Sequence, residues 1–561
     1  MAANQSSDQL DPHSPSSDSR SQRFALISSA LVSGLGVLAS RILGLIRDTM
    51  TARYLPLDVR DAFFVAFRLP NIFRRIFGEG ALSASITPVL IEILTTPPVH
   101  GSHSARTPEA LPVFNENERA RQFVAAMFSI TLVFTMVISL LAILFMDQIL
   151  GLLLSGSAYL TVPGKFSLTV QLAQIMFGFL VLVCLYAYLM ALLHSVKKFA
   201  AAAFAPVLFN ATMILAARLG SRWADEAVIL AWAVIVGGIL QLAVLLPFVV
   251  KHNLVPKITW RWEQPDVLKA MRKVLPGLFG LSVMQMVTIV NLHFASQLAP
   301  GSQSYLYLAD RLLELPLSLF VVSLGSALLP TLATQWVQGD RENMKETINH
   351  AIRLIIFLAL PASLGLYILA HPITEVLFMG GQFKYQEALA TAQIIQIYAI
   401  AIVFLGGVRV LAQGFYAIGN SWFPALAAAV ALISHIILAW ALTGAFGLVG
   451  LSAATVGSAL VNVLMLATAY HAWVGSLEFK KLARSVLVYL LCGLCLALVL
   501  ASYQPLLDWN NGRYLRRSWI LVLEIGLGGF AYFAAAHALR VQECREMVEI
   551  VFRKFKVRRP A

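Results

Sequence analysis

The sequence predicts an all-α polytopic membrane protein with about 14 transmembrane helices. Hydrophobic residues make up 58% of its 561 residues, charged residues make up 13%, and the mean hydropathy is +0.75. This composition is too apolar for a soluble protein of this length. Apolar stretches of about 20 residues, the length that crosses the hydrocarbon core, recur along the whole chain. They centre near residues 35, 80, 135, 180, 210, 238, 283, 320, 358, 400, 432, 460, 491 and 528.

The distribution of charge predicts how these helices are oriented. Residues 1–22 are polar and are expected to form a disordered tail, with no cleavable signal peptide before the first span. Most of the 42 lysines and arginines fall in tails and loops on the same side as this tail. Under the positive-inside rule, both termini therefore lie in the cytoplasm. We expect the basic tail at 542–561 to meet anionic lipid headgroups, and the spread of charge over short loops argues against nucleic-acid binding.

An internal repeat divides the spans into two halves. Residues 66–84 and 309–327 share identities at one fixed offset. We infer two six-helix repeats in parallel pseudo-symmetry, because an even number of helices per half gives both halves the same orientation in the membrane. The predicted domains are a first half at 23–255, a second half at 256–475 and two appended C-terminal helices, 13 and 14, at 476–541.

Two conspicuous features of the sequence are expected to have no catalytic, redox or metal-binding role. Residues 95–118 are Pro-rich and polar, have no counterpart in the second half, and predict a cytoplasmic surface loop that tolerates change. Cys492 and Cys495 have CxxC spacing. They lie inside an apolar span with no histidine or acid nearby, so they are interpreted as small hydrophobic residues.

The span near residue 80 carries charge where hydrocarbon is expected. Asp61, Arg68, Arg75 and Glu79 follow at i, i+7, i+14 and i+18, which places them within about 40° of one another on a helix. An arginine at mid-bilayer costs about 2.5–3.5 kcal/mol, so these side chains must face water, counter-charges or an anionic ligand. Arg74 lies about 100° off this stripe and has no carboxylate three or four residues away. We therefore expect Arg74 to be the arginine most available to a ligand.

Charged side chains also occur in the first and eighth spans. Planar guanidinium groups donate paired, charge-assisted hydrogen bonds to phosphate, and a diphosphate is the simplest ligand that engages several of them. The alternative is a buried network of ion pairs that only locks the helices together. The charged residues occur at corresponding spans of the two repeats, where a water-filled cavity is expected. This position favours a bound ligand over a purely structural network. The side chains concerned are Arg41, Arg47 and Asp48 in the first span and Asp310, Arg311 and Glu314 in the eighth.

Three segments resemble a known family. SRILGLIRD at 40–48, DAFFVAFRLPNIFRRIFGEGALS at 61–83 and ADRLLELP at 309–316 are similar to the signature segments of the MurJ/MviN lipid II flippases, within the multidrug/oligosaccharidyl-lipid/polysaccharide exporter superfamily. The resemblance implies a transporter of the bacterial cytoplasmic membrane and not an enzyme. It implies outward movement of undecaprenyl-diphosphate-linked disaccharide pentapeptide for peptidoglycan synthesis, by alternating access around a central cationic cavity.

The resemblance also implies roles for individual side chains. It implies that helices 13 and 14 form a hydrophobic groove for the lipid tail. The implied partners are lipid II, membrane lipids and cell-wall synthesis proteins, and no cofactor is implied. The implied substrate-binding residues are Ser40, Arg41, Arg47, Asn71, Arg74, Arg75 and Arg311. The implied cavity acids and gating residues are Asp48, Asp61, Glu79, Asp310 and Glu314.

An ion site found in some relatives is degenerate in this sequence. The resemblance implies that those relatives bind sodium. Their ligands would be a carboxylate or amide in span 7 and an Asn and an Asp four residues apart in span 11. The matching positions here are Asn291, His435 and Ala439. A hard cation requires several oxygen ligands, so we expect sodium to bind weakly or not at all and we assign no metal site. His435 is either a proton carrier or a hydrogen-bonded core residue.

Two other functions compete with this interpretation. A related exporter of drugs or of another polyprenyl-linked glycan would lack the combination of FRLPNIFRR and ADRLLE. A membrane-embedded glycosyltransferase would need a positioned acid or base near an aqueous loop. The sequence shows no nucleophile–base pair and no metal-ligand spacing, which favours a transporter.

The charge asymmetry makes a testable prediction about topology. In a background without the four native cysteines, a cysteine at Asn510 should react with an impermeant thiol reagent added to intact cells. A cysteine at Lys480 should react only after permeabilisation, because it lies on the positively charged side. Labelling in the reverse order would contradict the proposed orientation.

Overall fold

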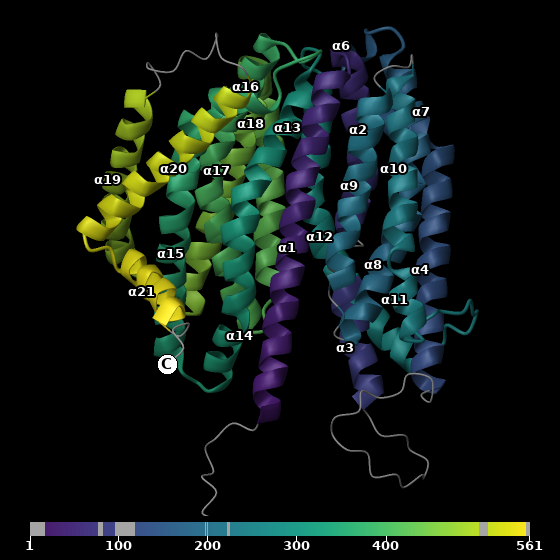
Figure 1. Ribbon diagram of the computed structural model, residues 1–561, viewed down its shortest axis with the longest axis horizontal. Helices are drawn as coiled ribbons and strands as arrows, with labels where there is room; N and C mark the ends of the chain where they lie inside the picture. Colours follow the sequence, from purple (N-terminus) through teal and green to yellow (C-terminus); the bar gives the residue numbers. More distant parts are fainter. Residues whose placement is uncertain are drawn as a thin grey trace, which may run out of the picture.

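The computed structural model describes residues 17–76, 82–95, 118–196, 198, 200–220, 225–503 and 514–556, and these residues are helical apart from short connections. The all-α fold class is therefore confirmed (Figure 1). The N-terminal helices are α1 (Ser17–Tyr54), α2 (Leu57–Ile76), α3 (Leu82–Thr95), α4 (Glu118–Leu144), α5 (Met146–Leu153), α6 (Ser157–Leu160), α7 (Lys165–Phe177), α8 (Phe179–Ser195), α9 (Ala200–Gly220), α10 (Glu226–Ala243) and α11 (Leu246–Lys251).

The remaining helices complete a second bundle and a C-terminal extension. They are α12 (Pro265–Ser296), α13 (Ser302–Pro316), the π-helix η3 (Leu317–Val322), α14 (Ser323–Val337), α15 (Arg341–Ile368), α16 (Ala370–Leu377), α17 (Tyr385–Ala417), α18 (Trp422–Trp473), α19 (Phe479–Tyr503), α20 (Tyr514–Ala538) and α21 (Gln542–Lys556).

Nine helices in the described ranges are long and apolar enough to cross a membrane. This number is smaller than the predicted total of about 14 spans for two reasons. The charged spans do not meet the criterion of hydropathy and charge, and α18 contains two spans in one helix. At Gly447 the backbone of α18 leaves the helical region, with φ of 56° and ψ of −132°. A Cβ atom at Gly450 would lie 2.1 Å from the carbonyl oxygen of Leu442. This close approach shows that α18 folds back on itself as an antiparallel helical pair.

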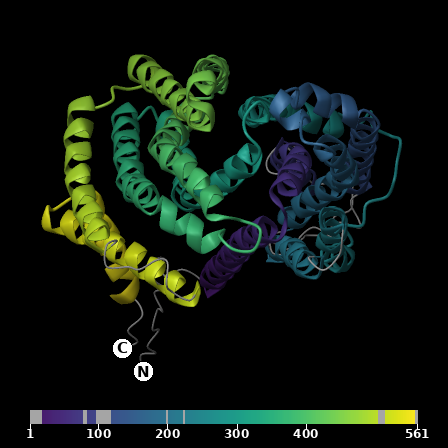
Figure 2. The ribbon, with the colours of Figure 1, turned by 90° about the horizontal axis from the view of Figure 1, so that it is seen from above.

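The two halves pack their helices in the same order. In the first half α1 packs against α9 and α2 against α7; in the second half α12 packs against α18 and α13 against α17. Figure 2 shows the halves as two groups, with α19 and α20 on the outer edge of the second. The repeated packing is what two parallel copies of one unit produce. The residue boundaries of the domains stay a prediction.

The halves meet at one end of the bundle, which we call the apical end. It is the end where α2, α13 and α17 begin, at the top in Figure 1. Arg60 of α2 is completely buried there and forms an ion pair of 3.0 Å with Glu387 of α17. The amide of Gly156 donates a hydrogen bond of 3.2 Å to the hydroxyl of Ser296 at the end of α12. The apical end is therefore closed in this structure.

At the opposite, basal end, the first turns of α12 attach to the first half. The guanidinium of Arg119 makes two hydrogen bonds to Asp266, of 2.6 and 2.7 Å. Lys269 contacts Glu92 of α3 at 2.5 Å. Since α12 also packs against α18 of the second half, this helix bridges the two halves.

The close apical contact predicts that Gly156→Ala opens this end. A Cβ atom at Gly156 would lie 2.3 Å from the backbone carbon of Ser296, so the backbones must move apart. Spin labels at two exposed apical positions, Leu152 on α5 and Tyr385 on α17, should show a longer mean distance in the variant. Gly151→Ala is the matched control, because a Cβ atom there meets no atom within 4 Å. Equal distances in both variants would show that this contact does not hold the apical end closed.

Candidate functional site

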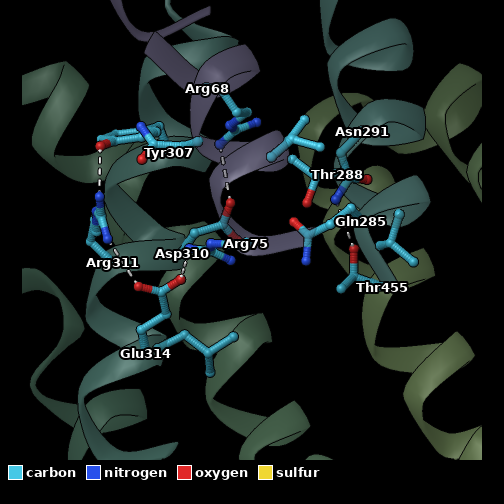
Figure 3. A pocket seen from close by; sticks show the side chains of 14 residues that line it. Arg68, Arg75, Gln285, Thr288, Asn291, Tyr307, Asp310, Arg311, Glu314 and Thr455 are labelled. Carbon is cyan, nitrogen blue, oxygen red and sulfur yellow. Dashed lines mark hydrogen bonds and ion pairs between the residues drawn. The ribbon is translucent and has the colours of Figure 1, made fainter. Parts of the chain in front are cut away.

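A charged pocket lies at the centre of the bundle between α2, α12, α13 and α18 (Figure 3). Its volume is about 200 Å³. Three arginines and two acids line it together with a tyrosine ring, and α12 and α18 supply amide and hydroxyl groups on the opposite wall. The charged lining residues are Arg68, Arg75, Asp310, Arg311 and Glu314, and the aromatic one is Tyr307.

Ion pairs across the pocket join the two halves. Arg68 of α2 contacts Asp310 of α13 at 3.1 Å. Arg75, two turns further along α2, forms an ion pair with Glu314 of α13. The same Glu314 accepts a hydrogen bond of 3.0 Å from Arg311. Each carboxylate therefore neutralises an arginine that would otherwise be costly to hold inside a membrane.

The pairing continues from the pocket into α1. Arg311 lies 2.9 Å from a carboxylate oxygen of Asp48, and Arg47 contacts the other oxygen at 2.7 Å. Arg47 also donates a hydrogen bond of 3.1 Å to Asn210 of α9. Asp48 and Arg47 are both buried, so they support the pocket from behind. Tyr307 lies between these groups: its hydroxyl accepts a hydrogen bond of 3.0 Å from Arg311.

Exposure rises along α2 from the apical end toward the basal end. Asp61 is 1% exposed, the side chain of Arg68 is 7% exposed, and the side chain of Arg75 is 35% exposed. These three residues belong to the stripe predicted from helical spacing. The charged stripe is therefore buried toward the apical end and partly exposed toward the basal end.

The structure brings some of the predicted site residues together in this pocket. The predicted residues that line it are Asn71, Arg75, Asn291, Asp310, Arg311 and Glu314. Ser40 lies behind it, where its carbonyl accepts a hydrogen bond of 3.0 Å from Asn210. Arg41 is exposed on α1. Glu79 lies outside the described residues.

Asp61 does not lie in the cavity. Its carboxylate accepts hydrogen bonds from the amides of Gly301 and Ser304, at 2.7 and 3.0 Å, and from the Ser304 hydroxyl at 2.5 Å. Lys165 of α7 completes the cluster at 2.8 Å. Asp61 therefore caps the N-terminus of α13, where a negative charge is favoured by the helix dipole. In this conformation Asp61 lies outside the pocket, and its role as a cavity acid and gating residue stays a prediction.

Arg74 is not the arginine most exposed to the pocket. Its Nε donates a hydrogen bond of 3.1 Å to the side chain of Asn71, and Arg74 is not among the residues that line the pocket. The sequence argument considered only carboxylates on the same helix. It missed the neighbouring amide, and it missed that Arg75 pairs with Glu314 of the second half and Arg311 with Asp48 of the first half.

The degenerate ion-site positions lie together beside the pocket. His435 is completely buried, and its Nε2 lies 3.0 Å from the amide oxygen of Asn291. The amide nitrogen of Asn291 is 3.5 Å from the hydroxyl of Thr455. Ala439, one turn from His435, is also completely buried. The oxygen of Asn291 is therefore engaged by the imidazole.

Sequence reasoning missed several residues in and around this site, and three of them show why. Tyr307 stacks on Phe64 at 4.2 Å and lies one helical turn before Arg311, a spacing that could have indicated it. Lys165 begins an otherwise apolar span, which is itself a signal of a buried counter-charge. Asn210 carries no comparable signal in the sequence.

Comparison with known proteins identifies the family. A family model described as lipid II flippase MurJ matches residues 58–518. The chain belongs to the MurJ family. A probable lipid II flippase MurJ from Bdellovibrio bacteriovorus is 38% identical over 525 residues, which cover 93% of this chain and 97% of that relative. Together with the apolar helices, MurJ membership identifies a multi-pass transporter of the bacterial inner membrane.

Solved structures show that the fold is shared. A lipid II flippase MurJ in an inward closed conformation has a TM-score of 0.73 at 23% identity, covering 92% of this chain and all of that chain. An inward-facing multidrug resistance transporter of the MATE family has a TM-score of 0.63 at 13% identity, covering 79% of this chain and 95% of that chain. This chain therefore shares its fold with a MurJ structure and with a MATE-family structure.

The buried position of Asp48 makes a prediction about stability. Asp48→Asn should lower the free energy of unfolding by about 3–5 kcal/mol, because Arg47 loses its buried counter-charge and Arg311 keeps only Glu314. Thermal unfolding of the purified protein in a mild detergent measures this loss. Glu478→Gln is the control: its pair with Lys481 is exposed, and such pairs contribute at most about 1 kcal/mol. Equal unfolding temperatures in the two variants would argue against the central pairing.

Proposed function

We propose that this chain moves lipid II, the undecaprenyl-diphosphate-linked disaccharide pentapeptide, from the cytoplasmic to the outer face of the bacterial inner membrane by alternating access. The cationic pocket between the two halves is the observation that carries the proposal. In this assignment the basal end faces the cytoplasm, and both termini lie on that side. The closed apical end and the exposure gradient along α2 support a state that receives its ligand from the basal side.

The ion pairs suggest how binding is coupled to movement. In this structure Glu314 of the second half contacts Arg75 of the first half and Arg311. A diphosphate is a stronger partner for a guanidinium, because it offers several charged oxygens to the planar fork. When the diphosphate replaces Glu314 as the partner of these arginines, the ion pair between Arg75 and Glu314 that joins the halves is lost. Binding therefore frees the second half to move relative to the first.

The other predicted residues take supporting roles in this proposal. Arg47 and Asp48 orient Arg311 through the contacts behind the pocket. Asp61 holds the apical end closed by capping α13, and it is released when that end opens. Ser40, Arg41, Asn71, Arg74 and Glu79 remain candidates for contacts with the headgroup in other states. The tail groove on α19 and α20, and the division into domains, likewise remain proposals.

The proposal predicts that Arg311→Ala abolishes flipping of lipid II in proteoliposomes. Arg311→Lys should restore little activity, because a point charge cannot make the paired contact with phosphate. The matched control is Arg353→Ala, which removes a guanidinium of similar burial on α15, where it pairs with Glu543 away from the pocket. That control should flip at the wild-type rate per folded protein.

The two outcomes separate a substrate site from a structural network. Full activity of a well-folded Arg311→Ala variant would place the substrate elsewhere. Equal loss in Arg311→Ala and Arg353→Ala would point to stability as the cause. Transport of a different polyprenyl-linked glycan or of a drug, with lipid II excluded, would favour the related exporter.

The degenerate ion site predicts the driving force. Flipping should persist when sodium is replaced by potassium, because His435 and Ala439 do not supply the oxygen ligands that sodium requires. It should collapse when the membrane potential is dissipated, since moving one charge through the field is worth about 2.3 kcal/mol per 100 mV. Ionophore-treated vesicles with defined ion gradients measure both effects, and a steep dependence on sodium would contradict the assignment.

A further inference from the structure

The connection between the two halves has an unusual position. Residues 252–264 join α11 to α12 without forming a helix. Figures 1 and 2 show this teal segment on the outer side of the first half, beside α4 and away from the central pocket. A connection in this place faces the surroundings of the protein and not the second half.

Three of its exposed side chains are large and apolar. Val255 is 55% exposed, Ile258 is 67% exposed and Trp260 is 73% exposed. The neighbouring Lys257 and Arg261 are exposed as well. Exposed apolar residues in a loop at an aqueous surface are unfavourable. The alternation of apolar and basic side chains is typical of segments that lie in a membrane interface.

The backbone is held along the membrane-spanning helix α4. The amide of Thr259 donates a hydrogen bond of 2.8 Å to the hydroxyl of Ser129. Ser129 lies 11 residues after Glu118, about 16 Å from the basal start of α4 at 1.5 Å per residue. The connection therefore turns back toward the membrane. Because it is not helical, its remaining backbone polar groups need water or headgroups, which excludes the hydrocarbon core and leaves the interface.

We propose that residues 255–261 form an interfacial anchor that binds anionic phospholipid headgroups. Trp260 and Ile258 enter the boundary between headgroups and acyl chains, and Lys257 and Arg261 contact lipid phosphates. The anchor belongs mechanically to the first half, through its bond to Ser129 and through the α12 contacts with α3 and α4. It holds the first half at a fixed depth while the second half moves. The proposal does not depend on which substrate is carried.

Depth-dependent quenching of tryptophan fluorescence tests the apolar part of the anchor. The protein is reconstituted with phosphatidylglycerol and phosphatidylcholine whose acyl chains carry bromine near the headgroup or near the chain end. Headgroup-proximal bromine should quench the wild-type protein more than Trp260→Phe, and chain-end bromine should show no such difference. Trp262→Phe is the control, because Trp262 is half-buried and its ring nitrogen donates to the carbonyl of Thr259. Quenching of Trp260 by aqueous iodide, with no difference in brominated lipid, would overturn the proposal.

Lipid selectivity tests the charged part. The relative affinity for spin-labelled phosphatidylglycerol over phosphatidylcholine should fall on the order of five-fold in Lys257→Gln and in Arg261→Gln. The control is Lys480→Gln with Lys481→Gln, which removes two basic groups from the same side of the membrane without flanking exposed tryptophan. An unchanged selectivity in the anchor variants, or an equal fall in the control, would overturn the proposal. Burial of Trp260 by a protein partner in lipid of neutral charge would also overturn it.

Discussion

The constraint on which this structure depends is the cost of placing guanidinium groups inside a membrane. Each of the central arginines has a carboxylate or a polar partner, and several of these partners come from a different helix. The pairing forms a continuous path from Asn210 through Arg47, Asp48 and Arg311 to Glu314 and Arg75. Helices that carry so much charge can stay in the bilayer only while they remain next to one another.

The same constraint explains why the site lies between the halves. If the acids and arginines of the pocket belonged to one half, their pairs would be insensitive to relative movement. Here Arg68 and Asp310 come from different halves, as do Arg75 and Glu314. A charged ligand that enters this set changes which groups are paired, and the arrangement of the halves must respond. The family of the chain and the chemistry of its pocket therefore lead to the same kind of function.

Much of this architecture follows from the sequence, because membrane insertion imposes strong patterns. The length of the apolar stretches predicts the membrane spans, and helical spacing predicts that Arg68 and Arg75 share one face of α2. The position of Asp61 does not follow, because its partners are backbone amides of α13, which no spacing within α2 can indicate. The contact of Arg74 with Asn71 was missed because only opposite charges were considered. The predicted spans near residues 432 and 460 require the chain to reverse between them, but a single glycine among many does not identify Gly447 as the residue that makes the turn.

The cap of Asp61 on α13 has a consequence for the solvent. When the halves separate at the apical end, the amides of Gly301 and Ser304 lose an acceptor, and the Asp61 carboxylate loses the donors that α13 supplies. Without water at the separated surfaces these groups would have no hydrogen-bond partner. The free-energy cost would be roughly 1–3 kcal/mol for each neutral group and more for a charged group. Water molecules must therefore bind to these groups as the protein contacts break, and water is a reactant in the opening step. Osmotic stress, which lowers the activity of water, therefore acts on the equilibrium between closed and open forms without touching the substrate.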